Sequence, residues 1–261
     1  MNRIKRSSTK LFLQDVALPV QTGEEKYVVV PHSTVMALTE EALASNNFEV
    51  IGESFLAARG GQQAIGKYFI KYGDDKDMGL MIAWNNSYDK STTLKWGIGS
   101  HVFVCGNGMI SSDMSYFKRK HMGGVEEIAV SSIAGFTKNA ANTFRELSES
   151  KEIMKEIELT KTVTAELIGR LYIEEEAITA TQLGIIKREI QHPSFDYGAK
   201  NSMWELYNHC TLALKEDHPH NWMDRHIEVN NFFVNKSGLY TLPQTVEEEE
   251  LADAELILNE N

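Results

Sequence analysis

The sequence predicts an α+β fold in which an N-terminal antiparallel β-meander is packed against a helical C-terminal half. In residues 47–105, short apolar segments alternate with a period of two and are separated by turn residues, which is typical of successive strands. In residues 125–236, apolar residues instead recur every three or four positions, which is typical of helices. Because the strands precede the helices, a doubly wound parallel sheet is not expected.

The first 45 residues predict an arm, a short strand and a helix. Residues 1–12 are expected to form a basic flexible arm, because they carry four bases and no acid. The segment KYVVV, residues 26–30, predicts a short strand that ends at Pro31. Residues 33–45 predict a helix, and Ser33 is its expected N-cap.

The meander is predicted by three segments with apolar residues on alternate positions. These segments are residues 68–72, 78–84 and 92–98. Between them lie GDDKD, residues 73–77, and NNSYDKS, residues 85–91, whose Gly, Asp, Asn and Ser residues favour turns. One face of such a sheet must be covered by an apolar layer.

The helical region, residues 123–240, is expected to supply that layer and to form one domain with the sheet region, residues 13–122. The predicted helices are residues 125–157, 162–176, 179–190, 203–215 and 221–235. Ser202 and Glu205 have the spacing of a capping box before the fourth helix. Gly238 is the expected C-cap of the last helix.

The net charge of −11 is unevenly distributed along the chain. Residues 244–261 are expected to form an acidic tail that contains seven acids and no base, so residues 1–245 carry a net charge of only −4. Two cysteines do not make a disulfide framework. No apolar run approaches the roughly 18 residues that span a membrane, and the basic N-terminus lacks a signal peptide's apolar stretch. We therefore expect a soluble cytoplasmic protein with no membrane association.

Several motifs resemble chemical sites without matching their spacing. Gly106-Asn107-Gly108 lacks the third glycine of a dinucleotide loop and predicts a tight turn. Cys105 is expected to be a buried strand residue rather than a nucleophile. Two groups contain metal-ligating residue types but lack metal-ligand spacing. They are Asp74, Asp75 and Asp77, and His209, Cys210, His218, His220 and His226. We therefore predict no cofactor, no metal and no catalytic residue.

A basic and aromatic cluster, YFKRKH at residues 116–121, predicts contact with nucleic acid. Lys and Arg suit phosphate groups, and aromatic rings stack on unpaired bases. The predicted binding residues are Arg3, Lys5, Arg6, Tyr116, Phe117, Lys118, Arg119, Lys120 and His121. An ordinary solvated loop has the same composition. The acidic tail either competes for this basic surface, docks a partner protein through its apolar end, or only increases solubility.

Dispersed motifs in both halves of the chain resemble a known family. The motif residues are Asn86, Ser87, Asp89, Ser91, Val104, Cys105, Asn107, His121, Trp204, Asn208 and Thr211. They occur in order, and over roughly residues 25–236 the chain resembles the phage/plasmid-like family called domain of unknown function 932. Lys90 departs from the family pattern, which usually has glycine there, and His209 stands where alanine is usual. The resemblance implies a gene carried by a phage or mobile element and implies no reaction.

Three functions remain open from the sequence. The first is a phage- or mobile-element-encoded, homo-oligomeric protein that binds or anneals single-stranded DNA in replication or recombination. The second is a module that binds a host or phage protein through the acidic tail and antagonises a host defence factor. The third is a metal-dependent hydrolase or nuclease that uses Asp89, His101, His121 or the group at Asp74. We favour the first, which is non-enzymatic, and leave catalysis undecided.

Overall fold

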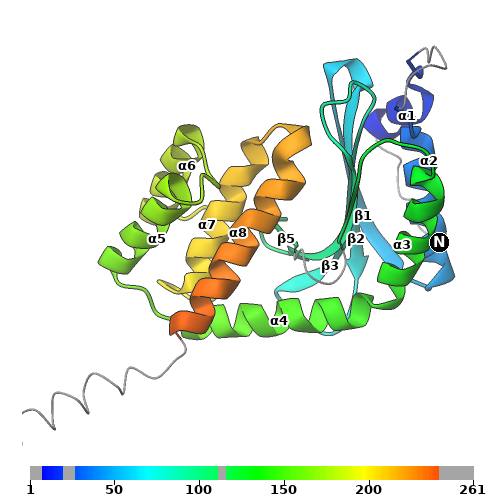
Figure 1. Cartoon of the computed structure of the whole chain (residues 1–261). Helices are drawn as coiled ribbons and strands as arrows, with labels where there is room; N and C mark the ends of the chain where they lie inside the picture. The colour runs from blue at the N-terminus through cyan, green and yellow to red at the C-terminus, as the bar shows by residue number, and fades with distance from the viewer. Residues whose placement is uncertain (1–7, 20–26, 111–115, 241–261) are drawn as a thin grey trace, which may run out of the picture.

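The computed structural model describes residues 8–19, 27–110 and 116–240, and it confirms the predicted α+β fold (Figure 1). The strands are β1 (Glu49–Ala58), β2 (Gln63–Lys71), β3 (Met78–Ser87), β4 (Leu94–Val102), β5 (Gly108–Ile110) and β6 (Tyr116–Arg119). The α-helices are α1 (Ser8–Asp15), α2 (His32–Ser45), α3 (Val125–Lys138), α4 (Ala140–Glu156), α5 (Lys161–Ile173), α6 (Ala180–Gln191), α7 (Met203–Ala213) and α8 (Pro219–Tyr240). Two short 3₁₀ turns are η1 (Arg59–Gly61) and η2 (Leu214–Glu216).

The strands form one antiparallel sheet, as the sequence predicts. β1 to β4 pair consecutively, and the sheet order is β1-β2-β3-β4-β5. Both β5 and β6 pair with β4: β5 lies opposite Gly99–His101, and β6 lies opposite Leu94–Gly97. β6 contains most of the YFKRKH segment, for which no strand was predicted. Its pairing therefore fixes which side of the sheet each of these side chains faces.

Both faces of the sheet are buried, which the sequence did not predict. On one face, the Trp96 indole N–H donates to Thr39 Oγ1 of α2 at 3.0 Å, and the Phe136 ring of α3 lies 6.2 Å from the Trp96 ring. The other face packs against α8 through Ile65, Met81, Ala83, Ile110, Trp222, Met223 and Ile227. Figure 1 shows α2 and α3 on one side of the sheet and α7 and α8 on the other. Consequently every residue of β3 and β4 is buried.

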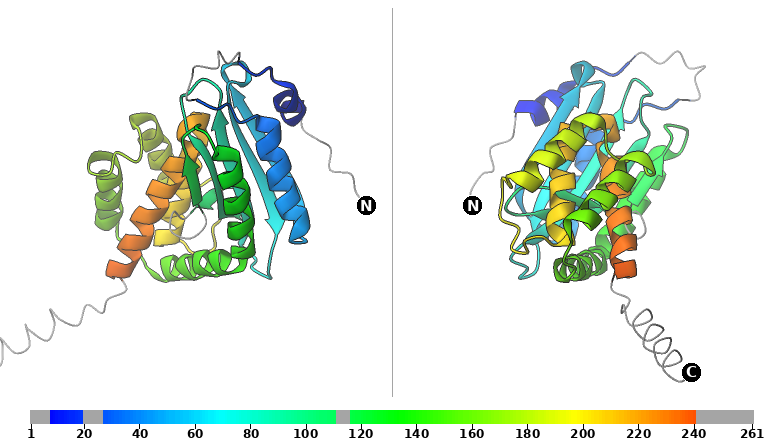
Figure 2. Two further views of the ribbon diagram at one scale, coloured as in Figure 1. Left: turned by 45° about the vertical axis from the view of Figure 1, so that its right-hand side comes forward. Right: turned by 90° about the vertical axis from the view of Figure 1, so that its left-hand side faces the viewer.

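α4 connects the two helical layers. It runs along one end of the sheet, and α5 and α6 lie beyond α7 and α8, away from the sheet (Figures 1 and 2). The prediction of one helix over residues 125–157 is wrong, because the helix breaks at Asn139. Phe136 packs on the sheet, whereas the Phe144 ring meets the Tyr72 ring edge-on at 5.2 Å. Because the chain changes direction at Asn139, apolar residues of both α3 and α4 can pack on different parts of the sheet.

Three predictions for the N-terminal segment are wrong. Residues 27–31 are irregular and make no strand, so the strand predicted at residues 26–30 is absent from its described part. α2 begins at His32 after Pro31, and therefore Ser33 is not its N-cap. The flexible arm predicted over residues 1–12 does not extend past Ser8, where α1 begins.

Lys10 explains why α1 is held against the sheet. Its ammonium group lies 2.7 Å from Glu40 and 2.8 Å from Glu53, and its side chain is only 4% exposed. It also lies 5.2 Å from the centre of the Phe55 ring. Lys10 is therefore a buried anchor rather than a free cation. The predicted binding residues Arg3, Lys5 and Arg6, and the acidic tail beyond residue 243, lie outside the described residues.

The helices of the C-terminal half largely follow the predictions. Ser202 caps α7 by accepting from the Glu205 N–H at 3.2 Å, but the Glu205 carboxylate accepts from Asn201 N–H, so the predicted capping box is half formed. The four residues predicted to be buried are buried; they are Trp204, Tyr207, Thr211 and Leu214. Gly238 lies inside α8 and is not a C-cap, because the helix continues to Tyr240. None of the described helices is both long and apolar enough to cross a lipid bilayer.

Candidate functional site

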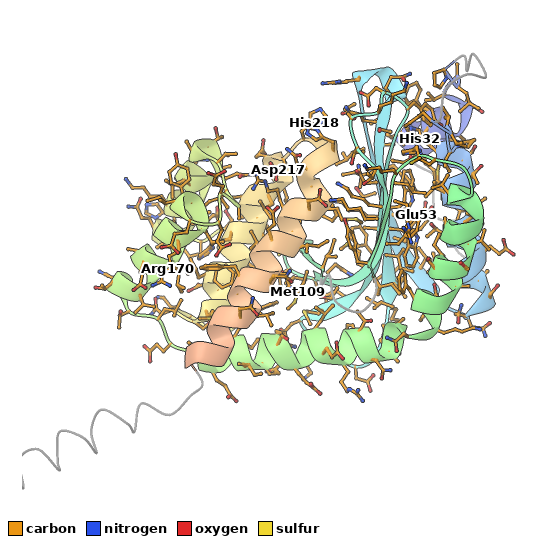
Figure 3. The ribbon with its side chains drawn as sticks, in the orientation of Figure 1. His32, Glu53, Met109, Arg170, Asp217 and His218 are labelled. Atoms are coloured by element: carbon orange, nitrogen blue, oxygen red, sulfur yellow. The ribbon has the colours of Figure 1, made fainter. Side chains whose placement is uncertain are left out.

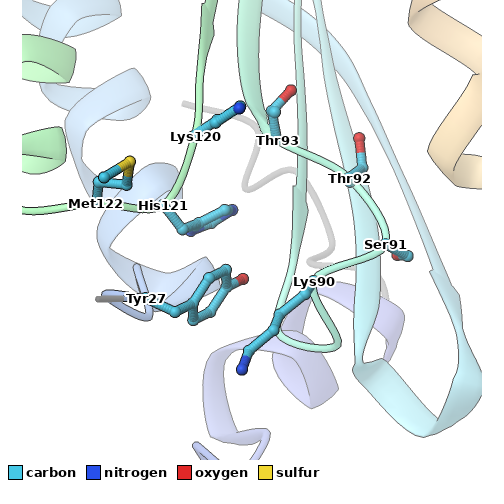
Figure 4. A pocket seen from close by; sticks show the side chains of 8 residues that line it. All are labelled: Tyr27, Lys90, Ser91, Thr92, Thr93, Lys120, His121 and Met122. Carbon is cyan, nitrogen blue, oxygen red and sulfur yellow. The ribbon is translucent and has the colours of Figure 1, made fainter. Parts of the chain in front are cut away.

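A cavity of about 370 Å³ opens at one end of the sheet, where the β3–β4 turn, the end of β6 and the segment before α2 meet (Figure 4). Its lining residues are Tyr27, Lys90, Ser91, Thr92, Thr93, Lys120, His121 and Met122. We call this cavity the cationic pocket, because two lysines line it and none of these eight residues is acidic. Hydroxyl groups and one aromatic phenol complete its wall.

The pocket is assembled from segments far apart in the sequence. The Val28 N–H donates to the His121 carbonyl at 3.0 Å, which joins the segment before α2 to the end of β6. The Tyr27 hydroxyl donates to the Ser87 carbonyl at 2.8 Å, which joins the same segment to the end of β3. The Tyr27 and His121 rings are 4.9 Å apart and lie side by side in Figure 4.

The pocket combines positive charge with uncharged hydrogen-bonding groups. His121 is 3% exposed, and neither ring nitrogen has a hydrogen-bond partner among the described residues. Burial lowers the pKa of His121, so its neutral ring offers one donor and one acceptor at pH 7. Burial raises the pKa of Tyr27 to about 12, so the phenol stays protonated. Lys120 is exposed, and the Lys90 ammonium lies 5.2 Å from the centre of the Tyr27 ring.

Asn86 helps to position the segment before α2, which forms one wall of the pocket. Its side-chain amide donates to the Val30 carbonyl at 2.8 Å and lies 2.9 Å from Nδ1 of His32. Burial lowers the pKa of His32 to about 4, so this ring is a neutral partner. His32 is the first residue of α2, on the side of the sheet that α2 covers (Figure 3). Asn86 therefore holds the segment before α2 against the sheet.

Asp89 organises the turn after β3. Its carboxylate accepts from the Gln63 amide at 2.8 Å and from Arg59 at 3.1 Å, and it also accepts from the Ser91 N–H at 3.0 Å. Ser87 Oγ donates to a backbone carbonyl across the turn at 2.9 Å. The turn predicted for residues 85–91 is thus wrong at its start, because residues 85–87 belong to β3 and are fully buried. Asn86, Ser87 and Asp89 position the pocket without lining it, whereas the motif residue Ser91 lines it.

The structure separates the residues predicted to bind nucleic acid. Tyr116 and Phe117 are not available for stacking: the Tyr116 hydroxyl donates to Asp224 at 3.0 Å, and Phe117 is buried beneath α3. Lys118 is half exposed but lies 3.4 Å from the same Asp224 carboxylate. Arg119 and Lys120 are exposed, and of the predicted residues Lys120 and His121 line the pocket. Strand alternation in β6 separates Tyr116 and Lys118, which reach Asp224, from Phe117, whereas Lys120 and His121 follow the end of β6 at Arg119.

A second group of motif residues meets near the opposite end of β4. The Asn107 side-chain amide donates to the Asn208 carbonyl at 3.0 Å, and the Asn208 amide donates to the Trp204 carbonyl at 2.9 Å. Gly106 has φ +67°, which confirms the predicted tight turn. Cys105 is buried, as predicted, but the prediction that it lies in a strand is wrong, because β4 ends at Val102 and Cys105 belongs to the turn. Burial raises the pKa of Cys105, so the thiol stays protonated and is not an activated nucleophile. The group joins the β4–β5 turn to α7.

The groups considered for metal binding and catalysis do not converge. Asp75 lies 2.7 Å from Lys151, and Asp77 lies 2.5 Å from Lys155. Two of the three acids that were considered as a metal-binding group therefore serve as ion-pair partners. Across the part of the chain that the structure describes, no three His, Cys, Asp or Glu residues are placed to hold a metal ion.

The residues of the catalytic alternative are divided between the two ends of β4, because His121 lines the cationic pocket beside the turn that carries Asp89, whereas His101 lies at the other end. His101 lies at the end of β4 opposite the turn that carries Asp89, which is about 20 Å along the strand at ~3.3 Å per residue. Its ring lies 3.1 Å from the Leu80 carbonyl. His226 is buried with Nδ1 3.0 Å from the Gly108 carbonyl, whereas His218 lies before α8 (Figure 3).

Sequence reasoning missed the residues that complete the pocket. Tyr27, Lys90 and Thr92 were read as parts of a strand or a turn. One signal was available: Lys90 stands where the resembled family usually has glycine, and it adopts φ +62°, a backbone conformation that glycine adopts most easily.

Comparison with protein families matches residues 20–235 to the family described as "Domain of unknown function (DUF932)". The match spans both the sheet and the helical half, and it includes both groups of motif residues. Neither a curated protein nor a solved structure is similar enough to this chain to count as a match.

Proposed function

The chain belongs to the DUF932 family, and we propose that it is a non-enzymatic protein that binds single-stranded nucleic acid through the cationic pocket. The observation that carries the proposal is the meeting of Lys90, Lys120, Tyr27 and His121 around a cavity whose lining, as far as the structure describes it, contains no acid. In a protein of net charge −11, such a surface is unusual and favours an anionic ligand.

A single strand fits the pocket better than a duplex. The cavity of about 370 Å³ is large enough for one unstacked base, and its wall combines an aromatic ring with hydroxyl groups. Lys90 and Lys120 supply the charge for the flanking phosphates. The stacking role that was expected of Tyr116 and Phe117 passes in this proposal to Tyr27. A duplex would meet the acidic remainder of the molecule over a larger area.

We place this activity in replication or recombination of a mobile element, as a single-strand binder or annealer. The acidic residues 246–261 would then compete with the strand for the pocket. Removing these seven acids should strengthen binding most at low salt and make its dependence on salt steeper, because salt also screens the competing tail.

Fluorescence anisotropy with a labelled oligothymidylate tests the proposal. Replacing Lys120 with Gln should weaken binding about tenfold and reduce the slope of log affinity against log salt by about 0.7. Lys187→Gln is the matched control, because Lys187 is exposed on α6, far from the pocket. Tyr116→Phe should leave binding unchanged. Absence of binding at low salt, both for the full chain and after deletion of residues 246–261, would exclude the proposal.

A further inference from the structure

Two lysines on the α8 side of the sheet have no carboxylate partner among the described residues. The Lys67 ammonium of β2 lies 3.6 Å above the centre of the Trp222 ring, and the Lys215 ammonium of η2 donates to the Cys105 carbonyl. In the described parts of the chain, no carboxylate lies within 4.0 Å of either ammonium group. The lysines with almost fully buried side chains differ, because each is paired with an acid: they are Lys10, Lys95 and Lys151.

The groups that face Lys67 are neutral or basic. The residue opposite on β1 is Ser54. The neighbouring Glu53 points to the other face of the sheet, where it pairs with Lys10. The residue opposite on β3 is Ala83. From α8, the His226 ring lies against the Trp222 ring, tilted by 50° with centroids 4.4 Å apart.

The basic groups affect one another. Burial, together with a smaller contribution from the positive charge of Lys215, lowers the pKa of Lys67 to about 7. Burial also lowers the pKa of His226 to about 3, with a second contribution from the charge of Lys67. His226 is 1% exposed, its Nδ1 lies near the Gly108 carbonyl, and its Nε2 has no partner among the described residues. A counter-anion would relieve this accumulation of positive charge.

We propose that Lys67 and Lys215 form a binding site for a phosphate monoester. Lys215 contacts Cys105 and His226 contacts Gly108 on the same β4–β5 turn, and Lys67 joins this cluster through Trp222. The two ammonium groups of the cluster match the two negative charges that such a phosphate carries near neutral pH. The Trp222 ring beneath Lys67 limits the motion of that ammonium. The phosphate can belong to a free nucleotide or to the 5′ end of a nucleic-acid strand. The site lies on the α8 face, and it does not depend on strand binding at the cationic pocket.

Isothermal titration calorimetry of the full chain at pH 7, in a chloride buffer, measures this site. The probes are inorganic phosphate, thymidine monophosphate, and a short oligothymidylate with either a 5′ phosphate or a 5′ hydroxyl. Inorganic phosphate should bind, and Lys67→Met and Lys215→Met should each weaken that binding at least tenfold. Lys67→Arg should retain most of it, and Lys187→Met, which changes an exposed lysine of α6, should leave it unchanged.

The two oligonucleotides distinguish the source of the phosphate. Tighter binding of the 5′-phosphorylated strand assigns the site to strand ends, and equal binding of both strands, with monophosphate binding lost in Lys67→Met, assigns it to free nucleotides. Lys120→Gln should weaken strand binding and leave inorganic phosphate binding intact, so the two sites can fail separately. Failure of inorganic phosphate to bind, or equal binding by Lys67→Met and the unmodified protein, would overturn the inference.

Discussion

The ammonium group of Lys67, which has no carboxylate partner among the described residues, should make the free energy of unfolding depend on pH. In the folded protein burial lowers its pKa from 10.5 to about 7. The unfolded chain therefore binds more protons than the folded chain between these two values, so the free energy of unfolding rises with pH across this interval. The destabilisation is complete below pH 7, where Lys67 is protonated in both states, and it is lost as the pH approaches 10.5. Lys67→Met removes this dependence.

The magnitude follows from the pKa difference. At ~1.36 kcal/mol for each pH unit, the full difference corresponds to an upper limit of about 5 kcal/mol. Partial solvent exposure of Lys67 and its contact with the Trp222 ring, worth about 1–2 kcal/mol, reduce this limit. We expect the Met variant to be more stable than the unmodified protein by about 2 kcal/mol at pH 7 and by much less at pH 10.

Urea denaturation at several pH values between 6 and 10, without phosphate, measures the difference between the two proteins. Comparing them cancels the other titrating groups, because Lys215 and His226 are present in both. Lys67→Arg is the control that keeps the charge. A difference in unfolding free energy that does not change with pH would refute the reasoning. It would mean that Lys67 is solvated in the folded state.

Three further predictions follow from ion pairs and burial. Asp224→Asn should lower the free energy of unfolding by about 3 kcal/mol in urea denaturation, because Lys95, whose side chain is 3% exposed, loses its carboxylate partner at 2.6 Å. Asp75 should make stability fall as the pH drops from about 4 to about 2: burial raises its pKa, but the Lys151 hydrogen bond and others outweigh this and bring the pKa down to about 2. Asp75→Asn should flatten that acid transition by about 1–2 kcal/mol, measured by circular dichroism. Cys105 should resist alkylation in the native protein and react in urea, as measured by mass spectrometry, since burial keeps its thiol protonated.

Much of the fold could be predicted because its signals are local. The period of two in residues 68–98 predicts the meander, and the three- and four-residue spacing predicts α5 to α8 within a few residues. The break at Asn139 was missed because both halves of residues 125–157 have helical spacing. Only the positions of Trp96 and Tyr72 in the folded sheet show that the two halves cover different surfaces.

The candidate site was predicted less well, because charge pairing is not local. Lys118 and Lys120 stand two residues apart, yet Lys118 reaches Asp224 of α8 and Lys120 lines the pocket. Nothing in the YFKRKH segment distinguishes them. Lys10 gave a similar error, since its partners Glu40 and Glu53 are distant in the sequence.

By itself, the sequence determined the α+β class, the meander, the order of the helices, the tight turn at Gly106 and the family. Periodicity and turn chemistry act over a few residues, so they can be read along the chain. Only the tertiary structure decided which lysines are paired with a carboxylate and which are not. Lys10 and Lys118 are paired, whereas Lys120 lines a pocket and Lys67 lies over an indole without a carboxylate. Ion pairing depends on distances through space, and these distances exist only after the sheet has been covered on both faces.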